Sequence, residues 1–298
     1  MLSILIPTYN YNCTQLVKDL QQQAEALAIA YEIIVVDDAS LPAFVGENEK
    51  INTWQHCSFS ALPQNMGRAK IRNILASRAH YDYLLFMDCD GKVVRRHFLA
   101  NYLQAAAQAD VVVGGLCCLD TLPAPEKSLR YYYEQSVAKK KTVRKRNKKA
   151  YAQFTTFCFL IHKTAFEQIK FDESFTQYGH EDTFFGRELE RQGMRVLHID
   201  NPLCHLGLEE NSVYLQKTET SIKSLLHQKE KLMEASHLLI YYKRLQCWGV
   251  LPLLYAIYRL THTAIRKNLV GRKPSMLLFS FYKLAYLFQM DKERNQQT

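Results

Sequence analysis

Two acidic residues one position apart, Asp88 and Asp90, follow the apolar run Leu84–Met87 and precede Gly91. A run of four hydrophobic residues is typical of a strand buried on both faces, so we expect both acids at the carboxyl edge of a parallel sheet, where open α/β folds bind ligands. Carboxylates this close repel each other unless a cation or a polyol satisfies them. The pattern therefore indicates a divalent metal and a ribose, although a solvated turn also uses Asp and Gly.

The elements that must position these acids alternate between strands and helices. The first strand, helix and second strand form a βαβ unit, which implies a parallel pair. We therefore predict a doubly wound, mostly parallel α/β sheet flanked by helices. Pro7 is predicted to end the first strand, because proline cannot donate to the ladder. Strands are predicted at residues 2–6, 32–36, 57–61, 84–87, 111–115, 152–161 and 195–199, and helices at about 13–30, 67–79, 97–109 and 183–192.

Two regions depart from this alternation. Residues 127–151 are tyrosine-rich and then strongly basic, with no apolar periodicity after Val137, and are predicted to form a flexible loop. Beyond about residue 211 we predict one long polar helix to roughly residue 246 and then two apolar helical stretches. The predicted domains are an α/β domain over 1–210 and a helical, basic, apolar extension over 211–298 for membrane or subunit association.

The composition is that of a globular protein, since 48% of the 298 residues are hydrophobic and 22% are charged. This excludes a disordered chain. The eight cysteines have the spacing of neither a disulfide framework nor a zinc site. Met1 leads directly into an apolar stretch without the basic start of a signal peptide, so we expect reduced thiols and a cytoplasmic protein.

The net charge of +9 is unevenly placed: eight basic residues lie between 139 and 149, and no acid lies between Glu234 and Asp291. The apolar stretches after Trp248 fall short of the ~20 apolar residues that a spanning helix needs. Their aromatic and basic residues instead favour helices that lie in an interface. We predict that these helices bind an anionic membrane surface, which would place the protein peripherally on the inner face of the cell membrane. The alternative is that they pack on the α/β domain or on a second subunit in a homo-oligomer. No nucleic-acid module accompanies the charge, so nucleic acid is not an expected partner.

Several short motifs follow one another along the first part of the chain. They are Pro7-Thr8-Tyr9-Asn10, Val35-Val36-Asp37-Asp38-Ala39-Ser40, Asn65-Met66-Gly67-Arg68-Ala69 with Arg72-Asn73, Met87-Asp88-Cys89-Asp90-Gly91, Phe171-Asp172-Glu173, Gly179-His180-Glu181-Asp182 and finally His205. Their order resembles that of family 2 glycosyltransferases, the inverting, nucleotide-sugar-dependent enzymes of the GT-A fold. The resemblance covers roughly the first 210 residues. Each motif is weak alone, and the shared order carries the signal.

The resemblance implies a UDP-sugar donor and a Mn²⁺ or Mg²⁺ cofactor. Such an ion neutralises the charge that develops on the departing diphosphate and needs only one or two protein carboxylates. We expect Asp90 to bind the metal, Asp88 to hold the ribose or a metal-bound water, and His205 to complete the metal site. A lone histidine is otherwise more often structural.

The resemblance also implies a set of nucleotide contacts. Asp38 would accept the uracil imide proton, and Asp37 would be structural in its turn, although both acids also suit a helix cap. The backbone at Pro7 and Thr8 would line the base. Arg72 would contact the base or a phosphate.

The catalytic base that the resemblance implies is Asp182, the second acid of the Glu-Asp pair, and Glu181 would orient the acceptor. A base opposite the leaving group gives single displacement with inversion. The helix dipole also favours two acids in a first helical turn, which is the structural alternative.

The implied function is transfer of a sugar to a saccharide or lipid-linked saccharide in cell-surface polysaccharide synthesis. The QxxRW-type motif of processive synthases is missing, because Gln246-Cys247-Trp248 does not fit it, so we expect single additions. One alternative is a sugar-phosphate nucleotidylyltransferase, but its Gly-rich, Arg-containing loop after the first strand is missing. The other is an inactive membrane-bound scaffold of the same fold.

Overall fold

The computed structural model describes residues 1–139 and 141–297, and the chain divides into two compact units. The first unit is Met1–Cys118, Lys141–Thr176 and Phe185–Gly207. The second is Leu119–Lys140, Gln177–Phe184 and Leu208–Thr298. The second unit thus combines the predicted extension with two earlier segments of the chain, and the functional division at residue 210 stays a prediction.

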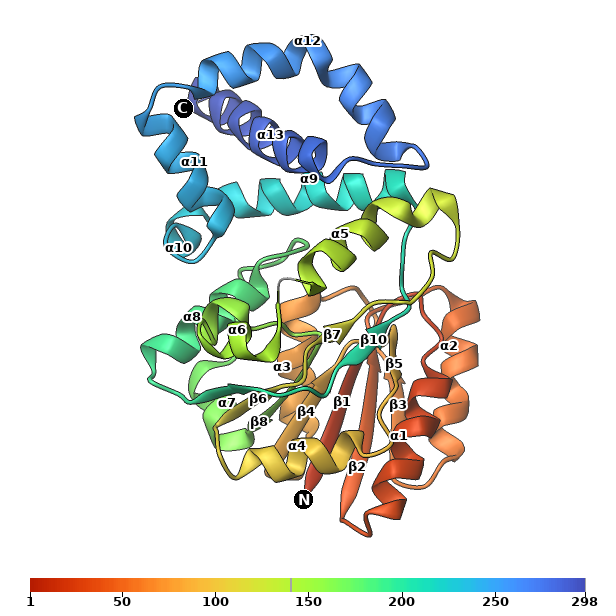
Figure 1. Ribbon diagram of the computed structural model, residues 1–298. Coiled ribbons are helices and arrows are strands. Elements are labelled where there is room, and N and C mark those ends of the chain that lie inside the picture. The colour runs from red at the N-terminus through yellow and green to blue at the C-terminus, as the bar shows by residue number, and fades with distance from the viewer. Residues whose placement is uncertain (140, 298) are drawn as a thin grey trace. The chain divides into compact units, whose positions relative to one another are not determined.

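A seven-stranded sheet with the order β3-β2-β1-β4-β8-β6-β9 forms the centre of the first unit (Figure 1). All neighbours are parallel except β8, which is antiparallel to both β4 and β6. This confirms the prediction of a mostly parallel sheet. The strands are β1 (Leu2–Thr8), β2 (Tyr31–Asp37), β3 (Cys57–Ala61), β4 (Tyr83–Met87), β6 (Val111–Val113), β8 (Cys158–His162) and β9 (Val196–His198).

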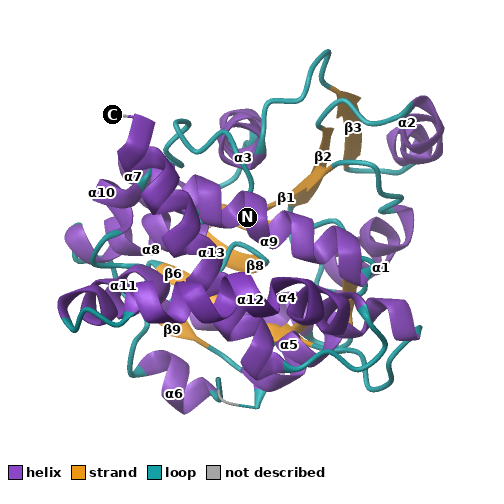
Figure 2. Ribbon diagram, turned by 90° about the horizontal axis from the view of Figure 1, so that it is seen from above, coloured by secondary structure: helices purple, strands orange, loops and turns teal. Residues whose placement is uncertain are grey.

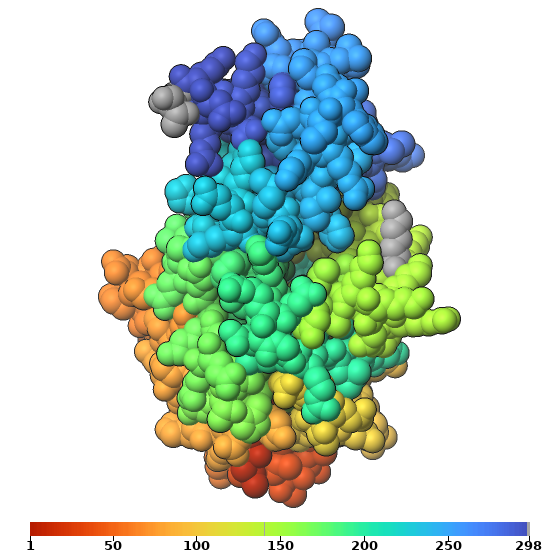
Figure 3. All heavy atoms as spheres, turned by 90° about the vertical axis from the view of Figure 1, so that its left-hand side faces the viewer, coloured from red at the N-terminus to blue at the C-terminus, as the bar shows by residue number. Residues whose placement is uncertain are grey.

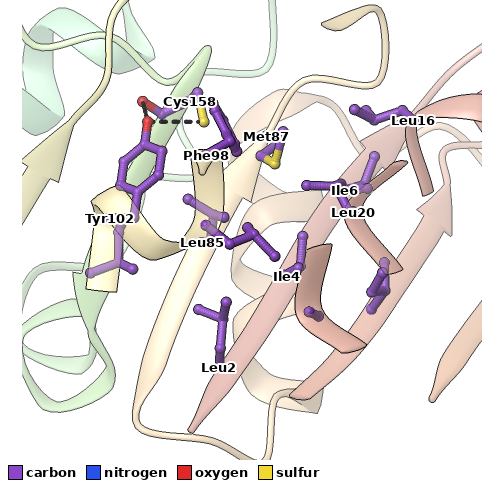
Figure 4. Close-up of a cluster of buried hydrophobic side chains, with 14 of the residues drawn as sticks. Leu2, Ile4, Ile6, Leu16, Leu20, Leu85, Met87, Phe98, Tyr102 and Cys158 are labelled. Carbon is purple, nitrogen blue, oxygen red and sulfur yellow. Dashed lines mark hydrogen bonds between the residues drawn. The ribbon is translucent and has the colours of Figure 1, made fainter. Parts of the chain in front are cut away.

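Helices cover both faces of this sheet because its strand residues are apolar on both sides. Leu85 and Met87 belong to a cluster with residues of α1 and α4, including Phe98 (Figure 4), whereas the ring of Phe86 stacks on Phe159 in a second cluster. Side chains alternate between faces along a strand, so one apolar run supplies both clusters. The helices that include residues of this unit are α1 (Thr14–Ala26), α2 (Pro42–Asn48), α3 (Arg68–Arg78), α4 (Phe98–Ala106), α6 (Val143–Asn147), α7 (Lys163–Ile169) and α8 (Glu181–Arg191), with 3₁₀ turns η1 (Glu49–Thr53) and η3 (Tyr151–Gln153).

The first strand continues through Pro7 to Thr8, so the prediction that Pro7 ends it was wrong. Pro7 pairs with Val36 of β2. Leu2 donates its N–H toward β2, and residues alternate along a strand, so the nitrogen of Pro7 points to the β4 side. The pairing of β1 with β4 already ends at Leu5. Proline at position 7 therefore costs the sheet no hydrogen bond.

The predicted flexible loop at 127–151 was also wrong for its described residues, because it contains α5 (Ser128–Ala138) and α6, while Lys140 lies outside them. In the first unit, Arg146 is 9% exposed and donates to the carbonyl oxygen of Ile199 (2.8 Å) and to Nδ1 of His198 (3.0 Å). Nε2 of His198 in turn donates to the carbonyl oxygen of Ala150 (2.9 Å). Polar contacts hold this segment, and a search for apolar periodicity does not detect them.

A small second sheet, with the order β5-β10-β7, also belongs to the first unit. It consists of β5 (Gly91–Val93), β7 (Leu116–Cys117) and β10 (Leu203–His205). β10 runs antiparallel to β5, with His205 opposite Gly91. This pairing brings the histidine to the turn that follows β4.

The second unit is helical. The predicted single helix from 211 to 246 was wrong, since Ser236 begins a new helix by accepting a hydrogen bond from the N–H of Leu239 (3.5 Å). The two apolar stretches do form helices, α12 and α13, which pack with α9 around an apolar cluster (Figure 2). Within 1–139 and 141–297, the structure contains no helix with the length and apolarity to cross a bilayer. The helices are α5, α9 (Asn211–His227), α10 (Lys229–Leu232), α11 (His237–Cys247), α12 (Leu251–Val270) and α13 (Met276–Gln297), with a 3₁₀ turn η2 (Pro125–Lys127).

Candidate active site

The turn after β4 carries the two acids of the Asp88-x-Asp90 pair. The N–H of Asp88 donates to the carbonyl oxygen of Phe157 in the segment before β8 (3.0 Å), and the N–H of Gly91 donates back to the oxygen of Asp88 (3.3 Å). Gly91 then begins β5 with no room for a side chain, because an added Cβ would lie 2.2 Å from Leu203. The strand thus ends in a fixed turn and not in a solvated loop.

Asp90 and His205 meet at this turn, although 115 positions separate them in the sequence. Nε2 of His205 lies 3.1 Å from Oδ2 of Asp90, and the N–H of Leu206 donates to the main-chain oxygen of Asp90 (2.9 Å). The His205 side chain is 1% exposed and that of Asp90 is 25% exposed. The structure therefore brings together the two residues that the sequence assigned to a metal.

The two side chains form a hydrogen-bonded pair in this structure, and the same two groups could hold a divalent cation. Two ligands about 2.1 Å from one ion at a right angle lie about 3 Å apart, close to the Asp90–His205 separation. Among the residues that the structure describes, no group of three or more His, Cys, Asp and Glu side chains is arranged to hold a metal ion. A site built on two protein ligands leaves the remaining positions to water and phosphate oxygens, which Mg²⁺ commonly keeps.

Asp88 makes an ion pair with Arg72 of α3, a contact that the sequence did not predict. Nη2 of Arg72 donates to Oδ1 of Asp88 (2.7 Å), while the Arg72 side chain is 2% exposed. Burial raises the pKa of Asp88, whereas the guanidinium groups of Arg72 and Arg68 lower it. Arg72 therefore holds the Asp88 carboxylate in place. The contact of Arg72 with the base or a phosphate stays a prediction, and so does the contact of Asp88 with the ribose or a metal-bound water.

The ends of β1 and β2 place Thr8 and Asp38 side by side, since the N–H of Asp38 donates to the oxygen of Thr8 (2.9 Å). The Asp38 carboxylate accepts from the N–H groups of Met66 (2.6 Å) and Gly67 (3.0 Å). Burial raises the pKa of Asp38, and these two hydrogen bonds lower it. Asp38 thus fixes the loop before α3. Its contact with uracil stays a prediction, as does the lining of the base by Pro7 and Thr8.

Asp37, the neighbouring acid, has the structural role that the sequence predicted. Its Oδ1 accepts from the N–H of Ser40 (2.7 Å), and its other oxygen accepts from the Ser40 hydroxyl. These bonds close the turn after β2. The side chain is fully buried and turned toward its own loop.

Tyr11 is a further residue of this edge that sequence reasoning missed. Its main-chain oxygen accepts from the Thr8 hydroxyl (3.1 Å). Burial, and then the charge of Asp90, raise the pKa of Tyr11 to about 12. The charge of the candidate metal ligand thus influences this phenol, and the position of Tyr11 inside the Thr8–Cys13 connection was the available signal.

Glu181 and Asp182 begin α8 and fall in the second unit. Glu181 is 5% exposed, and Oδ1 of Asp182 accepts from the N–H of Thr183 (2.6 Å). The two residues before them have positive φ angles, 100° at Gly179 and 74° at His180. An added Cβ at Gly179 would lie 2.6 Å from Oγ of Ser221, so a glycine is required there.

The surroundings of Asp182 within the second unit include α5. The pKa of Tyr133 is raised by burial first, and then by the charges of Tyr178, Glu134 and Asp182. His180 also contacts Ser221 of α9, with Nε2 3.1 Å from its main-chain oxygen. Sequence reasoning missed Tyr133 and Ser221, because both lie far from the Glu-Asp pair in the chain.

Comparison with known protein families gives one matching family model. The model described as Glycosyl transferase family 2 matches residues 3–170. A search of curated proteins found no match.

Several solved structures have a similar fold. The mannosyltransferase PcManGT from Pyrobaculum calidifontis, in complex with GDP-Man and Mn²⁺, is 16% identical with a TM-score of 0.60, over 98% of this chain and 86% of that one. Residues 1–349 of S. aureus TarS in complex with UDP-GlcNAc are 15% identical with a TM-score of 0.52, over 100% and 92%. GalNAc-T7 with UDP, GalNAc and Mn²⁺ is 17% identical with a TM-score of 0.53, over 70% and 44%. These similarities identify the fold as GT-A.

Proposed function

The chain belongs to glycosyl transferase family 2 and is a glycosyltransferase, and we propose that it transfers a sugar from a UDP-sugar, with inversion, to a saccharide or lipid-linked saccharide of a cell-surface polysaccharide. The observation that carries the donor half of this proposal is the 3.1 Å pair of Asp90 and His205 beside the anchored Asp88. The solved structures with this fold include complexes with UDP-GlcNAc and with GDP-Man and Mn²⁺.

In this mechanism, Asp90 and His205 would hold the Mn²⁺ or Mg²⁺, and the bound ion would neutralise the charge of the leaving diphosphate. Asp88, oriented by Arg72, would accept a hydrogen bond from the ribose or from a water on the metal. Asp38 accepts the imide proton of uracil, the backbone at Pro7 and Thr8 lines the base, and Arg72 adds positive charge near the phosphates.

Asp182 is the proposed general base, and it takes the proton of the acceptor hydroxyl as that oxygen attacks the anomeric carbon. Glu181 orients the acceptor. A single displacement of this kind breaks the bond from carbon to diphosphate as the new bond forms on the opposite face, and the anomeric configuration is therefore inverted.

The test of the donor site is Mn²⁺-dependent binding of UDP, measured by the rise in melting temperature, since a ligand that binds only the folded state stabilises it by mass action. GDP is titrated in parallel. We expect Asp90→Ala to abolish the UDP-dependent rise, and the exposed Asp200→Ala to keep it. Equal UDP binding by the wild type and Asp90→Ala would refute the metal assignment, and an Asp90→Ala protein with full transfer activity would do the same. Absence of both UDP binding and transfer in the wild type would favour the inactive scaffold, whereas the family match already disfavours the nucleotidylyltransferase.

We also propose a cytoplasmic location on the inner face of the cell membrane, with α12 of the second unit on the bilayer. α12 packs through Tyr258 and Ile265, yet on its other side Leu253 is 66% and Leu260 is 88% exposed, and Ile257 between them is 44% exposed. Residues of α11 and α12 form part of the surface seen in Figure 3. A helix that is apolar on two sides needs a second apolar contact.

An anionic bilayer is the favoured partner for this face because the chain from 235 to 290 contains bases but no acid. A second copy would bring the same positive charge. We expect co-sedimentation with vesicles containing phosphatidylglycerol, loss of binding in Leu260→Glu, and retention in Thr263→Glu, which adds the same charge at another exposed position of α12. Unchanged vesicle binding by Leu260→Glu would refute this assignment, as would a dimer that only this variant dissociates.

A further inference from the structure

A half-buried lysine of the second unit, Lys283 on α13, lies against two aromatic rings. Its Nζ lies 4.9 Å from the centroid of the Tyr133 ring and 4.7 Å from that of Phe279. The ring of Tyr214 lies 6.3 Å from that of Tyr133 and 5.9 Å from that of Phe279. Ring faces attract a cation but offer it no hydrogen-bond acceptor.

The other cations around these rings have carboxylate partners. Arg130 donates to Glu134 (2.8 Å) and to Glu209, and Lys217 pairs with the other oxygen of Glu209. Among the residues that the structure describes, none forms an ion pair or a hydrogen bond with Nζ of Lys283. Burial lowers the pKa of Lys283 accordingly. An ammonium that is partly removed from water and has no carboxylate partner would be stabilised by an anionic ligand.

The proposed catalytic base, Asp182, belongs to the same unit as this lysine. Tyr133, which contacts Lys283, is also the tyrosine whose pKa Asp182 helps to raise. Tyr133 therefore contacts a cation suited to hold a negative charge, and its hydroxyl is influenced by the charge of a carboxylate suited to take a proton. Its ring and those of Tyr214 and Tyr178 offer apolar surface of the kind on which the C–H face of a sugar packs.

We propose that Lys283 binds an anionic group of the acceptor, a phosphate or a carboxylate, so that the acceptor of this transferase is an acidic saccharide or a saccharide phosphate. This proposal rests on the proposed function, in which Asp182 takes the proton of the acceptor hydroxyl. Lys283 fixes the end of the acceptor that does not react, and the reacting hydroxyl is thereby oriented toward Asp182.

Two probes test the site and separate the two sources of charge: inorganic phosphate and methyl α-D-glucuronide, each titrated by calorimetry. Lys283→Gln is compared with Lys292→Gln, which removes the same charge from an exposed position of the same helix. We expect Lys283→Gln to bind at least one probe about tenfold or more weakly than the wild type, since one charge-assisted hydrogen bond is lost. Lys292→Gln should bind like the wild type, and Lys283→Arg should recover most of the loss.

The outcomes distinguish the possible acceptors. Lysine-dependent binding of phosphate alone assigns a phosphorylated acceptor, and that of the glucuronide alone assigns an acidic sugar. Equal binding by wild type and Lys283→Gln overturns the proposal, as does binding of neither probe by the wild type at millimolar concentration. A ¹³Cε chemical shift of a neutral Lys283 amine at pH 7.5 also overturns it.

Binding of UDP with Mn²⁺ is measured on the same samples. Retained UDP binding by Lys283→Gln shows that the variant is folded. It also separates a failure of this anion site from a failure of the proposed transferase function, because only the second removes UDP binding from the wild type.

Discussion

Replacing Arg72 by Met tests whether the buried ion pair holds the first acid of the Asp88-x-Asp90 turn. Methionine keeps the apolar contacts of a side chain that is 2% exposed, but it leaves Oδ1 of Asp88 without the guanidinium nitrogen at 2.7 Å. Removing one partner of a buried pair costs about 3–5 kcal/mol. Because the Asp88 side chain is 21% exposed, water recovers part of this loss, and we expect about 3 kcal/mol. The melting temperature should therefore fall by roughly 6–12 °C.

The assay is urea denaturation of Arg72→Met, Asp88→Asn and the double variant. The double variant should be less destabilised than the sum of the single variants by about 2 kcal/mol, because the second substitution removes a charge that the first left unpaired. Arg78→Met is the control on the same helix: Arg78 is exposed and donates to Oγ of Ser60 (2.6 Å), and it should cost under about 0.5 kcal/mol. Single effects that add to within about 0.5 kcal/mol would refute the coupling.

Three further predictions concern other parts of the chain. Burial holds the pKa of His198 at about 4, below its unfolded value of 6.5. The contribution of His198 to the free energy of unfolding is therefore complete above pH 6.5 and should fall by at most about 3 kcal/mol as the pH drops toward 4. Denaturation across this pH range should show a smaller loss of stability in His198→Gln than in the wild type, and equal losses would contradict this prediction. Gly207→Ala places a Cβ 2.1 Å from Oδ2 of Asp90, so the Mn²⁺-dependent affinity for UDP should fall about tenfold. The control Gly46→Ala, whose added Cβ meets nothing within 4 Å, should not change this affinity. An unchanged affinity in Gly207→Ala would show that Asp90 does not need its observed position. Asp182→Asn should lower kcat by about 10²–10⁴ with UDP binding retained, and full activity in a transfer assay would exclude it as the base.

Much of the first unit was predictable because apolar runs and acids follow a local pattern. The strand 57–61 was predicted with its observed bounds, and the alternation of strands and helices gave a mostly parallel sheet. The predictions were wrong where polar contacts or residues far away in the sequence determine the local structure. Arg146 belongs to a run of basic residues that looks solvated, yet its guanidinium is buried among carbonyl oxygens that lie far away in the sequence.

The sequence by itself determined the family and the sheet that places acids at strand ends, whereas the assignment of Asp90 and His205 to a metal site came from the resemblance and stays a prediction. The sequence could determine the first two because strand periodicity and short motifs are properties of neighbouring residues. Only the tertiary structure decided that Arg72 is buried against Asp88, that α5 forms in the predicted loop, and that Lys283 lies against aromatic rings with no carboxylate partner among the described residues. These facts depend on which distant side chains exclude water from one another, and burial of that kind leaves no mark on the local pattern of a chain.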